Sequence, residues 1–489
     1  MQIAVLAAFI LVLTLLETPG AIVPEPAWLF ASAVGAYLLV SAALGRLGAV
    51  LTMRALRAEA GVSRSAVRWY GLLGMGQRVW MVGGIGAVAA WGYGHWVMAG
   101  LGLGRLPLVG TLAVVAPMIA ALVLHWLLDY PVQREFRRRL AQVGVVPAGP
   151  PGAAAAEPPQ AWTRGQYLLF CLRQDLLMIG VPLCLILLLR ESLVLYVQPL
   201  LPKAWGEDAT AAASLVAAAA VLVVTPSLIV RIWGARRLPE GALRDLLLDI
   251  RRRVGVTYRQ VMIWPTGRNV ANAAVLGLVG PFRYVLLSDA LLQYFDERSV
   301  VAVYFHEVKH IQARHLPYFM LALPSLAAVC GICGQWLARA AGGGDTASEL
   351  AALGLLVLVG GLVFGWVSRR FERQCDVFSA WMMSPPAADP DASSMGPGGP
   401  RVITPEGAQT FSWALQRIAL MNGGSPTRRS WRHGSIASRV EHLRRIAAAG
   451  STPEPIDRLV RRIKLGIWLA FAAAVALGVL DYCLQGTAQ

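Results

Sequence analysis

Two histidines and a glutamate in the middle of the chain have the spacing of a metal-binding helix. The segment His306-Glu307-Val308-Lys309-His310 reads H-E-x-x-H inside an apolar run that favours a helix. On a helix, His306 and His310 lie one turn apart on one face, so both imidazoles can reach one metal ion. Glu307 is then placed to take a proton from a water on that metal. The alternative is a chance match, so the rest of the chain must supply a third ligand and a suitable setting.

A third ligand is predicted near the end of a later apolar segment. A catalytic zinc needs three protein ligands and one open position. Glu372 and Asp376 are one helical turn apart within residues 368–378, S-R-R-F-E-R-Q-C-D-V-F. Glu372 could bind the metal while Asp376 accepts a hydrogen bond from a ligand imidazole. The alternative is a solvated charge cluster at a membrane border, but the first motif, predicted at the same membrane face, favours the metal site.

The elements that must position these residues are mostly apolar. Of 489 residues, 56% are hydrophobic and only 15% are charged, whereas a soluble protein carries about a quarter charged residues. About nine stretches approach the length that spans a bilayer, which predicts a mainly α-helical, polytopic membrane protein. These stretches are 2–17, 27–45, 79–99, 107–128, 166–189, 209–230, 318–338, 350–367 and 465–482. A cleaved signal peptide is the alternative for 2–17, and the lack of a preceding Lys or Arg disfavours it.

The net charge of +16 is distributed as a topology signal. Basic clusters follow the second, fourth, sixth and eighth predicted spans, while loops such as 18–26 and 339–349 are poor in Lys and Arg. This alternation predicts a cytoplasmic N-terminus, cytoplasmic segments at 231–317 and 369–464, and a C-terminus on the opposite side. Topology and contact with anionic lipids therefore explain the charge better than nucleic-acid binding, for which no motif is visible.

A small sheet is predicted just before the H-E-x-x-H helix. Residues 242–253 have the pattern of an amphipathic helix, and three strand-like runs separated by Gly and Pro follow it. These runs are 260–264, 270–276 and 283–287. Ser288 is placed to cap a short helix through Tyr294, and Asp296 or Glu297 begins the next helix, which carries the motif. The sheet could offer an edge to an extended peptide, or it could be a purely structural hairpin, and the sequence leaves both open.

Five regions follow from these patterns. They are an N-terminal transmembrane bundle of about six spans (1–239), a catalytic region with the small sheet and the H-E-x-x-H helix (240–317), a transmembrane hairpin (318–368), a second catalytic segment with the Glu ligand helix and a disordered loop at 384–406 (369–460), and a C-terminal transmembrane helix (461–489).

Four motifs occur in linear order between residues 240 and 446. They are N-A-A-V-L-G at 272–277 with the following 284–292, H-E-V-K-H-I-Q-A-R-H ending at His315, S-R-R-F-E-x-Q-x-D-x-F at 368–378, and H-G-S-I-A-S-R-V at 433–440. Together they resemble integral-membrane zinc endopeptidases of the CAAX prenyl protease type and the related bacterial heat-shock membrane proteases. The resemblance implies a zincin-like catalytic domain at the cytoplasmic face. The spans before residue 240 match only as hydrophobic helices.

The resemblance also implies a role for each matching residue. The implied roles are zinc ligation by His306, His310 and Glu372, activation of water by Glu307, orientation of a ligand histidine by Asp376, hydrogen bonding to the tetrahedral oxyanion by His433 with help from Arg439, and presentation of backbone or amide groups to the substrate by Asn272 and Ala273. For His315, which also matches, a structural polar contact is expected.

The chain departs from the family pattern at several points. Lys309 stands where Gly is usual, Gly434 where Pro is usual, and Cys375 where Ala is usual. A span also follows the catalytic region. A long cation at Lys309 could narrow the cleft, but none of these departures removes a proposed ligand.

The leading hypothesis is a membrane-embedded zinc metalloendopeptidase that acts on peptide or membrane-protein substrates within a lipid bilayer. Processing of a lipidated C-terminal peptide and quality-control cleavage of damaged membrane proteins both remain open. One alternative is a catalytically silent protein, sensor or transducer that retains the zinc site. Another is a transporter with coincidental motifs, which would bind no stoichiometric zinc.

Overall fold

The computed structural model describes most of the chain as helices around one small sheet. It describes residues 2–17, 26–58, 64–142, 161–342, 344, 348, 351–352, 354–385 and 402–486. These residues divide into two compact units, which are described separately. The first unit holds the described residues up to 142, those from 161 to 235, and 265–269, while the second holds 236–264 and those from 270 onward.

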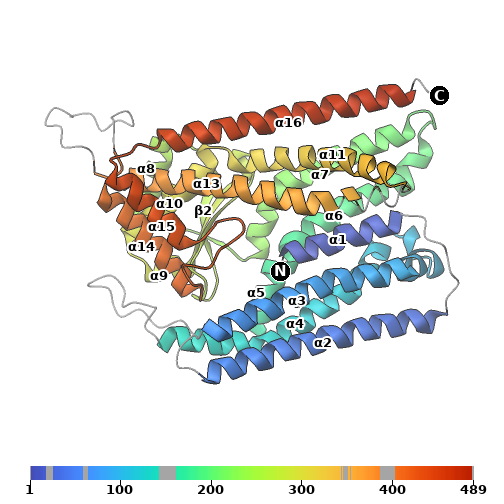
Figure 1. The fold of residues 1–489 in the computed structure, drawn as a ribbon, viewed down its shortest axis with the longest axis horizontal. Helices are drawn as coiled ribbons and strands as arrows, with labels where there is room; N and C mark the ends of the chain where they lie inside the picture. The colour runs from blue at the N-terminus through green and yellow to red at the C-terminus, as the bar shows by residue number, and fades with distance from the viewer. Residues whose placement is uncertain are drawn as a thin grey trace. The chain divides into compact units, whose positions relative to one another are not determined.

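The first unit is a bundle of long apolar helices. The α-helices are α1 (Gln2–Glu17), α2 (Ala27–Ala58), α3 (Arg64–Val88), α4 (Val109–Gln142), α5 (Arg164–Cys171), α6 (Met178–Ser192) and α7 (Gly206–Ile232). Short π or 3-10 turns connect them, namely η1 (Ala89–Tyr93), η2 (Trp96–Gly100), η3 (Leu103–Arg105), η4 (Leu172–Leu177), η5 (Leu193–Val197) and η6 (Gln198–Leu200). Within this unit, α2, α3 and α4 pack side by side (Figure 1).

Six helical segments are long and apolar enough to cross a membrane, which confirms the prediction of a multi-pass membrane protein. They are Ala27–Ala58, Val109–Leu140, Arg164–Leu200, Gly206–Ile232, His315–Ala338 and Glu454–Val479. Of the other predicted spans, 2–17 forms the 16-residue helix α1, and 79–99 continues from α3 into π turns. The span 350–367 includes positions outside the described residues. The count of nine and the cytoplasmic placement therefore stay predictions.

The second unit contains a four-stranded mixed sheet in the order β1-β2-β4-β3. Its strands are β1 (Arg236–Arg237), β2 (Gln260–Trp264), β3 (Ala273–Leu276) and β4 (Tyr284–Ser288). β2 and β4 are parallel, while β1 and β3 pair antiparallel with their neighbours. The three predicted strands are thus confirmed, and β3 is an edge of the sheet. Gly277 ends β3 with φ +106°, where a Cβ would lie 2.4 Å from the carbonyl oxygen of Phe282, so only glycine fits.

Eight α-helices and two short turns with described bounds complete the second unit. They are α8 (Ala242–Val254), α9 (Asp289–Tyr294), α10 (Glu297–Gln312), α11 (His315–Ala340), α13 (Gly361–Met382), α14 (Pro405–Met421), α15 (Ile436–Ala448) and α16 (Glu454–Gly486), with the short turns η7 (Gly280–Phe282) and η8 (Leu356–Gly360). Ser288 accepts a hydrogen bond from the Leu291 N–H, and Asp296 accepts one from the Ser299 N–H. These side chains satisfy the free N–H groups at the starts of α9 and α10, so both predicted helix starts are confirmed.

The loop predicted at 384–406 ends earlier than expected. Thr404 caps α14, which begins at Pro405, and Ile403 is fully buried. A capping threonine followed by proline is a helix start, and the prediction of a loop through residue 406 was wrong at this end. Residues 386–401 of the predicted loop lie outside the described residues.

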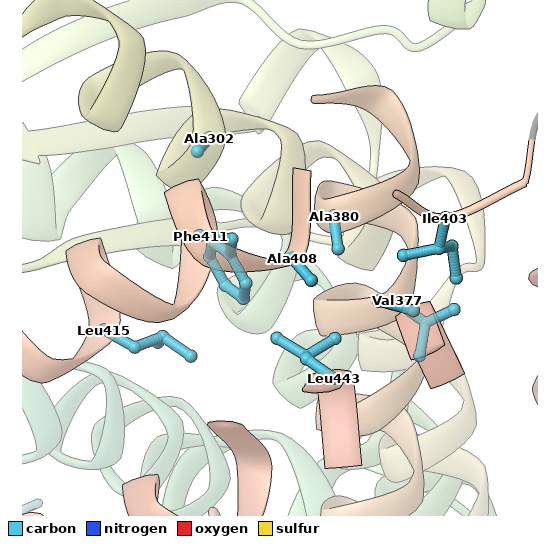
Figure 2. Packing of buried hydrophobic residues seen from close by; sticks show 9 residues of the cluster. Ala302, Val377, Ala380, Ile403, Ala408, Phe411, Leu415 and Leu443 are labelled. Carbon is cyan, nitrogen blue, oxygen red and sulfur yellow. The ribbon is translucent and has the colours of Figure 1, made fainter. Parts of the chain in front are cut away.

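The helices that carry the predicted site share one hydrophobic core. Figure 2 shows this core between α10, α13, α14 and α15. Its buried members are Ala302, Val377, Ala380, Ile403, Ala408, Phe411, Leu415, Leu443 and Ala447. Burying each large apolar side chain contributes about 1.5–3 kcal/mol, so this core holds the four helices in fixed relation. Phe411 also stacks on the His306 ring, with 5.5 Å between ring centroids.

Candidate metal centre

His306 and His310 turn their Nε2 atoms toward each other from one face of α10. The two Nε2 atoms are 3.4 Å apart. His306 is buried in the core, whereas His310 is partly exposed. The structure therefore places the two imidazoles as the H-E-x-x-H spacing predicts.

Glu372 reaches the two histidines from α13. Its Oε2 lies 3.6 Å from His306 Nε2, and its Oε1 lies 3.7 Å from His310 Nε2. A tetrahedral ion bound at about 2.1 Å has ligand atoms about 3.4 Å apart. The two imidazoles and the Glu372 carboxylate, which is distant only in sequence, therefore have the mutual spacing that one small divalent cation requires.

Neighbouring positive groups keep Glu372 ionised. Burial alone would raise the pKa of Glu372, but a hydrogen bond from His433 and the charge of Arg439 outweigh it and hold the pKa well below its usual range. His433 Nδ1 lies 3.0 Å from Glu372 Oε1, and Arg439 Nη1 lies 3.4 Å from Glu372 Oε2. A deprotonated carboxylate is the form that binds a metal.

Asp376 lies behind His306 on the same face of α13 as Glu372. Its Oδ1 is 3.1 Å from His306 Nδ1, although the direction of the ring N–H falls outside hydrogen-bond geometry. Burial alone would lower the pKa of His306, but Asp376 and Glu372 outweigh it, and the net effect is a raised pKa. Asp376 therefore favours a proton on Nδ1, which leaves the Nε2 lone pair directed at the other donors.

Glu307 and His433 stand at the same cluster. Glu307 is half-buried beside His306, and burial raises its pKa. The charges of His306, Glu372, His433 and Arg439 also act on the pKa of Glu307. The His433 side chain is 45% exposed, so a bound peptide could reach it.

The loop of His433 explains one departure from the family pattern. Ser430 and Gly434 exchange two backbone hydrogen bonds of 2.9 Å, which close a tight turn around His433. Gly434 has φ +75°, a conformation that proline cannot adopt. Ser435 then caps α15, the helix that carries Arg439.

Lys309 has partners outside the donor triangle, which is the group of His306, His310 and Glu372. Its Nζ donates to Gln312 Oε1 at 3.0 Å and lies 3.9 Å from Asp457 Oδ1. It also lies 4.7 Å from the centroid of the Phe378 ring. The cation that replaces the usual glycine is thus paired with an acidic and an aromatic side chain.

Cys375 is a candidate donor that sequence reasoning missed. In the part of the chain that the structure describes, the group His306, His310 and Cys375 could hold a metal, with one atom of each within 4.8 Å of the others. Burial, reinforced by the charges of Glu372 and Asp376, raises the thiol pKa well above its usual value. Glu372, whose pKa is held low and whose oxygens lie 3.6 and 3.7 Å from the two Nε2 atoms, is the better third donor.

Asn272 and Ala273 lie at the start of the edge strand β3, which packs against α10. The Asn272 N–H donates to Ser288 Oγ, and the Ser288 N–H donates to the Asn272 carbonyl, both at 2.9 Å. The Asn422 side chain bonds both the N–H and the C=O of Ala271, which fixes the chain just before the strand. The predicted substrate-binding residues therefore border the metal-binding helix.

A row of polar side chains lies behind His310. His315 Nδ1 is 3.0 Å from His310 Nδ1, and His315 Nε2 is 2.8 Å from Gln374 Oε1. Gln374 Nε2 donates to Asp457 Oδ1 at 2.5 Å. Sequence reasoning included Gln374 in a matching motif without giving it a role. It missed Asp457, which the sequence shows only as an acidic residue at the start of an apolar helix.

Comparisons with known proteins agree with this geometry. Residues 237–446 match the sequence profile described as peptidase family M48. Over 139 residues the chain is 28% identical to a protein named "Protease HtpX homolog" from Pyrobaculum aerophilum, which covers 28% of this chain and 39% of that relative. The chain thus aligns with well under half of the relative's length. These matches confirm the predicted resemblance to membrane metalloproteases.

A solved structure is also similar. The crystal structure of S. mikatae Ste24p aligns with 85% of this chain and 98% of its own, with a TM-score of 0.46 and 12% sequence identity.

Proposed function

We propose that this protein is a membrane-embedded zinc metalloendopeptidase. The observation that carries the proposal is the convergence of His306, His310 and Glu372, with Glu307 on the same helix as the two histidines, within the region that matches the M48 profile. Two imidazoles and one carboxylate are the ligand set of many catalytic zinc sites, which keep a further position open.

The residues around the donor triangle have separable roles in peptide hydrolysis. Zinc, when bound, supplies Lewis acidity that lowers the pKa of a water molecule and polarises a carbonyl. Glu307 takes the proton from the attacking water and delivers it to the leaving amine. His433, exposed and next to Glu372, donates a hydrogen bond to the developing oxyanion. Arg439, whose guanidinium contacts both buried carboxylates, holds Glu372 and Asp376 in place.

The edge strand β3 offers backbone hydrogen-bonding groups to an extended substrate. The Asn272–Ser288 pair is hydrogen-bonded, and bonded pairs alternate along an antiparallel ladder. The N–H and C=O groups of Ala273 and Val275 therefore point to the free edge of the described sheet. A peptide that paired there would lie beside α10, which carries Glu307.

The natural substrate is proposed at the level of class. The multi-pass fold supports a peptide or membrane-protein substrate delivered from the bilayer, cleaved at the cytoplasmic face. A lipidated peptide and an unmodified membrane protein remain alternatives, and assaying a fluorescent prenylated peptide beside an unmodified membrane substrate separates them.

The proposal is tested on the full chain purified in detergent. Metal analysis is expected to find about one zinc per chain, and chelation should remove both zinc and cleavage until zinc is restored. Glu307→Gln should keep zinc and lower cleavage by about 10²–10⁴-fold, because it loses the base but no ligand.

The matched control is Glu297→Gln in the first turn of the same helix, which should cleave like the wild type. A Glu307→Gln protein that cleaves at the wild-type rate would overturn the mechanism. Stoichiometric zinc without turnover on any substrate would favour a silent or sensory protein, and absence of zinc would favour the transporter hypothesis.

A further inference from the structure

Four side chains from α16, α13, α11 and α10 form one hydrogen-bonded row that ends at a proposed metal ligand. The row runs from Asp457 through Gln374 and His315 to His310. Its separations are 2.5, 2.8 and 3.0 Å. Gln374 and His315 are buried, so water does not offer them other partners.

The acidic end of the row fixes the direction of every hydrogen bond in it. An ionised carboxylate only accepts, so Gln374 must turn its amide NH₂ to Asp457 and its Oε1 to His315. His315 Nε2 must then carry the hydrogen and donate to Oε1. A neutral imidazole has one donor nitrogen and one acceptor, so His315 Nδ1 is an acceptor facing His310 Nδ1. His310 must donate from Nδ1, which leaves its Nε2 lone pair for the donor triangle.

We propose that His315, oriented by Gln374 and Asp457, is a positioning residue that fixes the metal-binding tautomer of His310. The opposite direction would place the Gln374 carbonyl oxygen against the Asp457 carboxylate, two acceptors at hydrogen-bond distance. The inference rests on the proposed metal site, and it assigns chemistry to a histidine for which sequence reasoning expected only a structural contact.

Packing around His315 supports the same arrangement. Its ring stacks on Phe371 at 4.1 Å between centroids and 9° between planes, which prevents it from turning away. Cys375 Sγ lies 3.7 Å from His315 Nδ1, and its buried thiol is a second potential donor to that nitrogen. Arg314, with φ +52°, makes the sharp corner between α10 and α11 that brings His315 beside His310.

Contacts with α10, α11 and α13 fix the position of α16, the helix that carries Asp457. Lys464 on α16 donates to the Ala313 carbonyl at the end of α10 and lies 4.9 Å from the centroid of the Tyr318 ring. Val460 of α16 is fully buried with Phe371 and Val367. Asp457 therefore belongs to a helix that is anchored on the metal-binding elements.

The test measures zinc affinity by competition with a chelator, on full-length protein in detergent, with the visible spectrum of the Co²⁺-loaded protein as a second readout. His315→Phe keeps the ring that stacks on Phe371 but has no acceptor, and it is expected to weaken zinc binding by about 10–100-fold. His315→Asn places an amide oxygen near the Nδ1 position and should recover most of that loss. Phe319→Leu, which alters packing on Phe371 without removing a polar atom, should leave zinc affinity within a few-fold of the wild type.

Asp457→Asn tests the acidic end of the row independently. An amide both donates and accepts, so this change allows the Gln374 amide to turn over. The loss of zinc affinity should therefore be smaller than in His315→Phe. In the double variant with His315→Phe, Asp457→Asn should cause no further loss of zinc affinity, because both changes act through the same hydrogen-bonded row. Unfolding of the metal-free proteins is measured alongside, and His315→Phe and His315→Asn should unfold at similar temperatures.

The outcomes are distinguishable. Wild-type zinc affinity in His315→Phe, equal losses in the Phe and Asn variants, or additive losses with Asp457→Asn would each overturn the positioning role while leaving the metal site intact. A wild-type protein that binds no zinc would overturn the proposed function itself.

Discussion

Arg439 and Asp376 form a bidentate, buried ion pair. Arg439 Nε lies 2.7 Å from Asp376 Oδ2, and Nη2 lies 2.5 Å from Oδ1. The third nitrogen, Nη1, lies 3.4 Å from Glu372 Oε2, so one guanidinium contacts both carboxylates of the α13 face. Arg439 therefore offsets part of the negative charge that these two buried groups bring to the site.

Arg439→Met should destabilise the protein by about 3–5 kcal/mol, because it leaves Asp376 buried without its partner. The measurement is denaturant unfolding of the metal-free protein. The double variant Arg439→Met with Asp376→Leu should recover part of the loss, since no charge is then left alone. Arg445→Met on the same helix is the control, because its pair with Glu441 is exposed and should change stability by no more than about 0.5 kcal/mol. Equal effects at both arginines would contradict the buried pair.

Glu372→Ala and Cys375→Ala decide which residue is the third ligand. Removing Glu372 should abolish stoichiometric zinc, whereas Cys375→Ala should retain it, because the thiol is held in its protonated form. Absorption of the Co²⁺-loaded protein provides a second measurement, since thiolate ligation adds a charge-transfer band. Such a band, or zinc loss in Cys375→Ala, would assign the ligand to the cysteine instead.

Gly434→Pro should impair cleavage although proline is the usual residue of the family pattern. The positive φ of Gly434 excludes proline, so the turn that carries His433 must rearrange. Gly434→Ala should cost about 1–2 kcal/mol in stability at this left-handed position and leave more activity. Steady-state cleavage and thermal unfolding of both variants test this prediction. A fully active proline variant would show that the turn is not needed for His433 to function.

Val275→Pro tests the substrate strand. It removes an N–H that points to the free edge of β3 and leaves the bonds to β4, so KM should rise while the unfolding temperature stays near the wild-type value. Ala274→Pro is the matched control, because its N–H faces β4 and its loss should lower the unfolding temperature. An unchanged KM in Val275→Pro would place the substrate elsewhere.

Local sequence signals predicted the elements of this site well. The H-E-x-x-H spacing, the cap at Asp296 and the Gly- and Pro-bounded strands depend on residues close in sequence, and the structure places each as expected. The approach of Glu372 to His306 was predicted because the spacing of Glu372 and Asp376 and the H-E-x-x-H motif were expected at the same membrane face, and the order of the motifs supported it.

Other contacts between distant elements were beyond sequence reasoning. Asp457 is 83 residues from Gln374, and nothing in its neighbourhood marks it as a partner. The sequence predicted Arg439 beside the oxyanion, and that role stays a prediction. Its contacts with two carboxylates depend on the packing of α15 against α13. The sequence marks Cys375 only as a replacement for alanine, and its closeness to the two histidines depends on the fold.

The corner at Arg314 has a consequence for which bonds can be cut. His315 is the first residue of a candidate membrane span, and His310 is only five positions earlier on the preceding helix. Under the proposed function, this places the metal site close to one end of that candidate span. A substrate would then present its scissile bond near that end, which would favour segments that emerge from the lipid over stretches of chain far out in water.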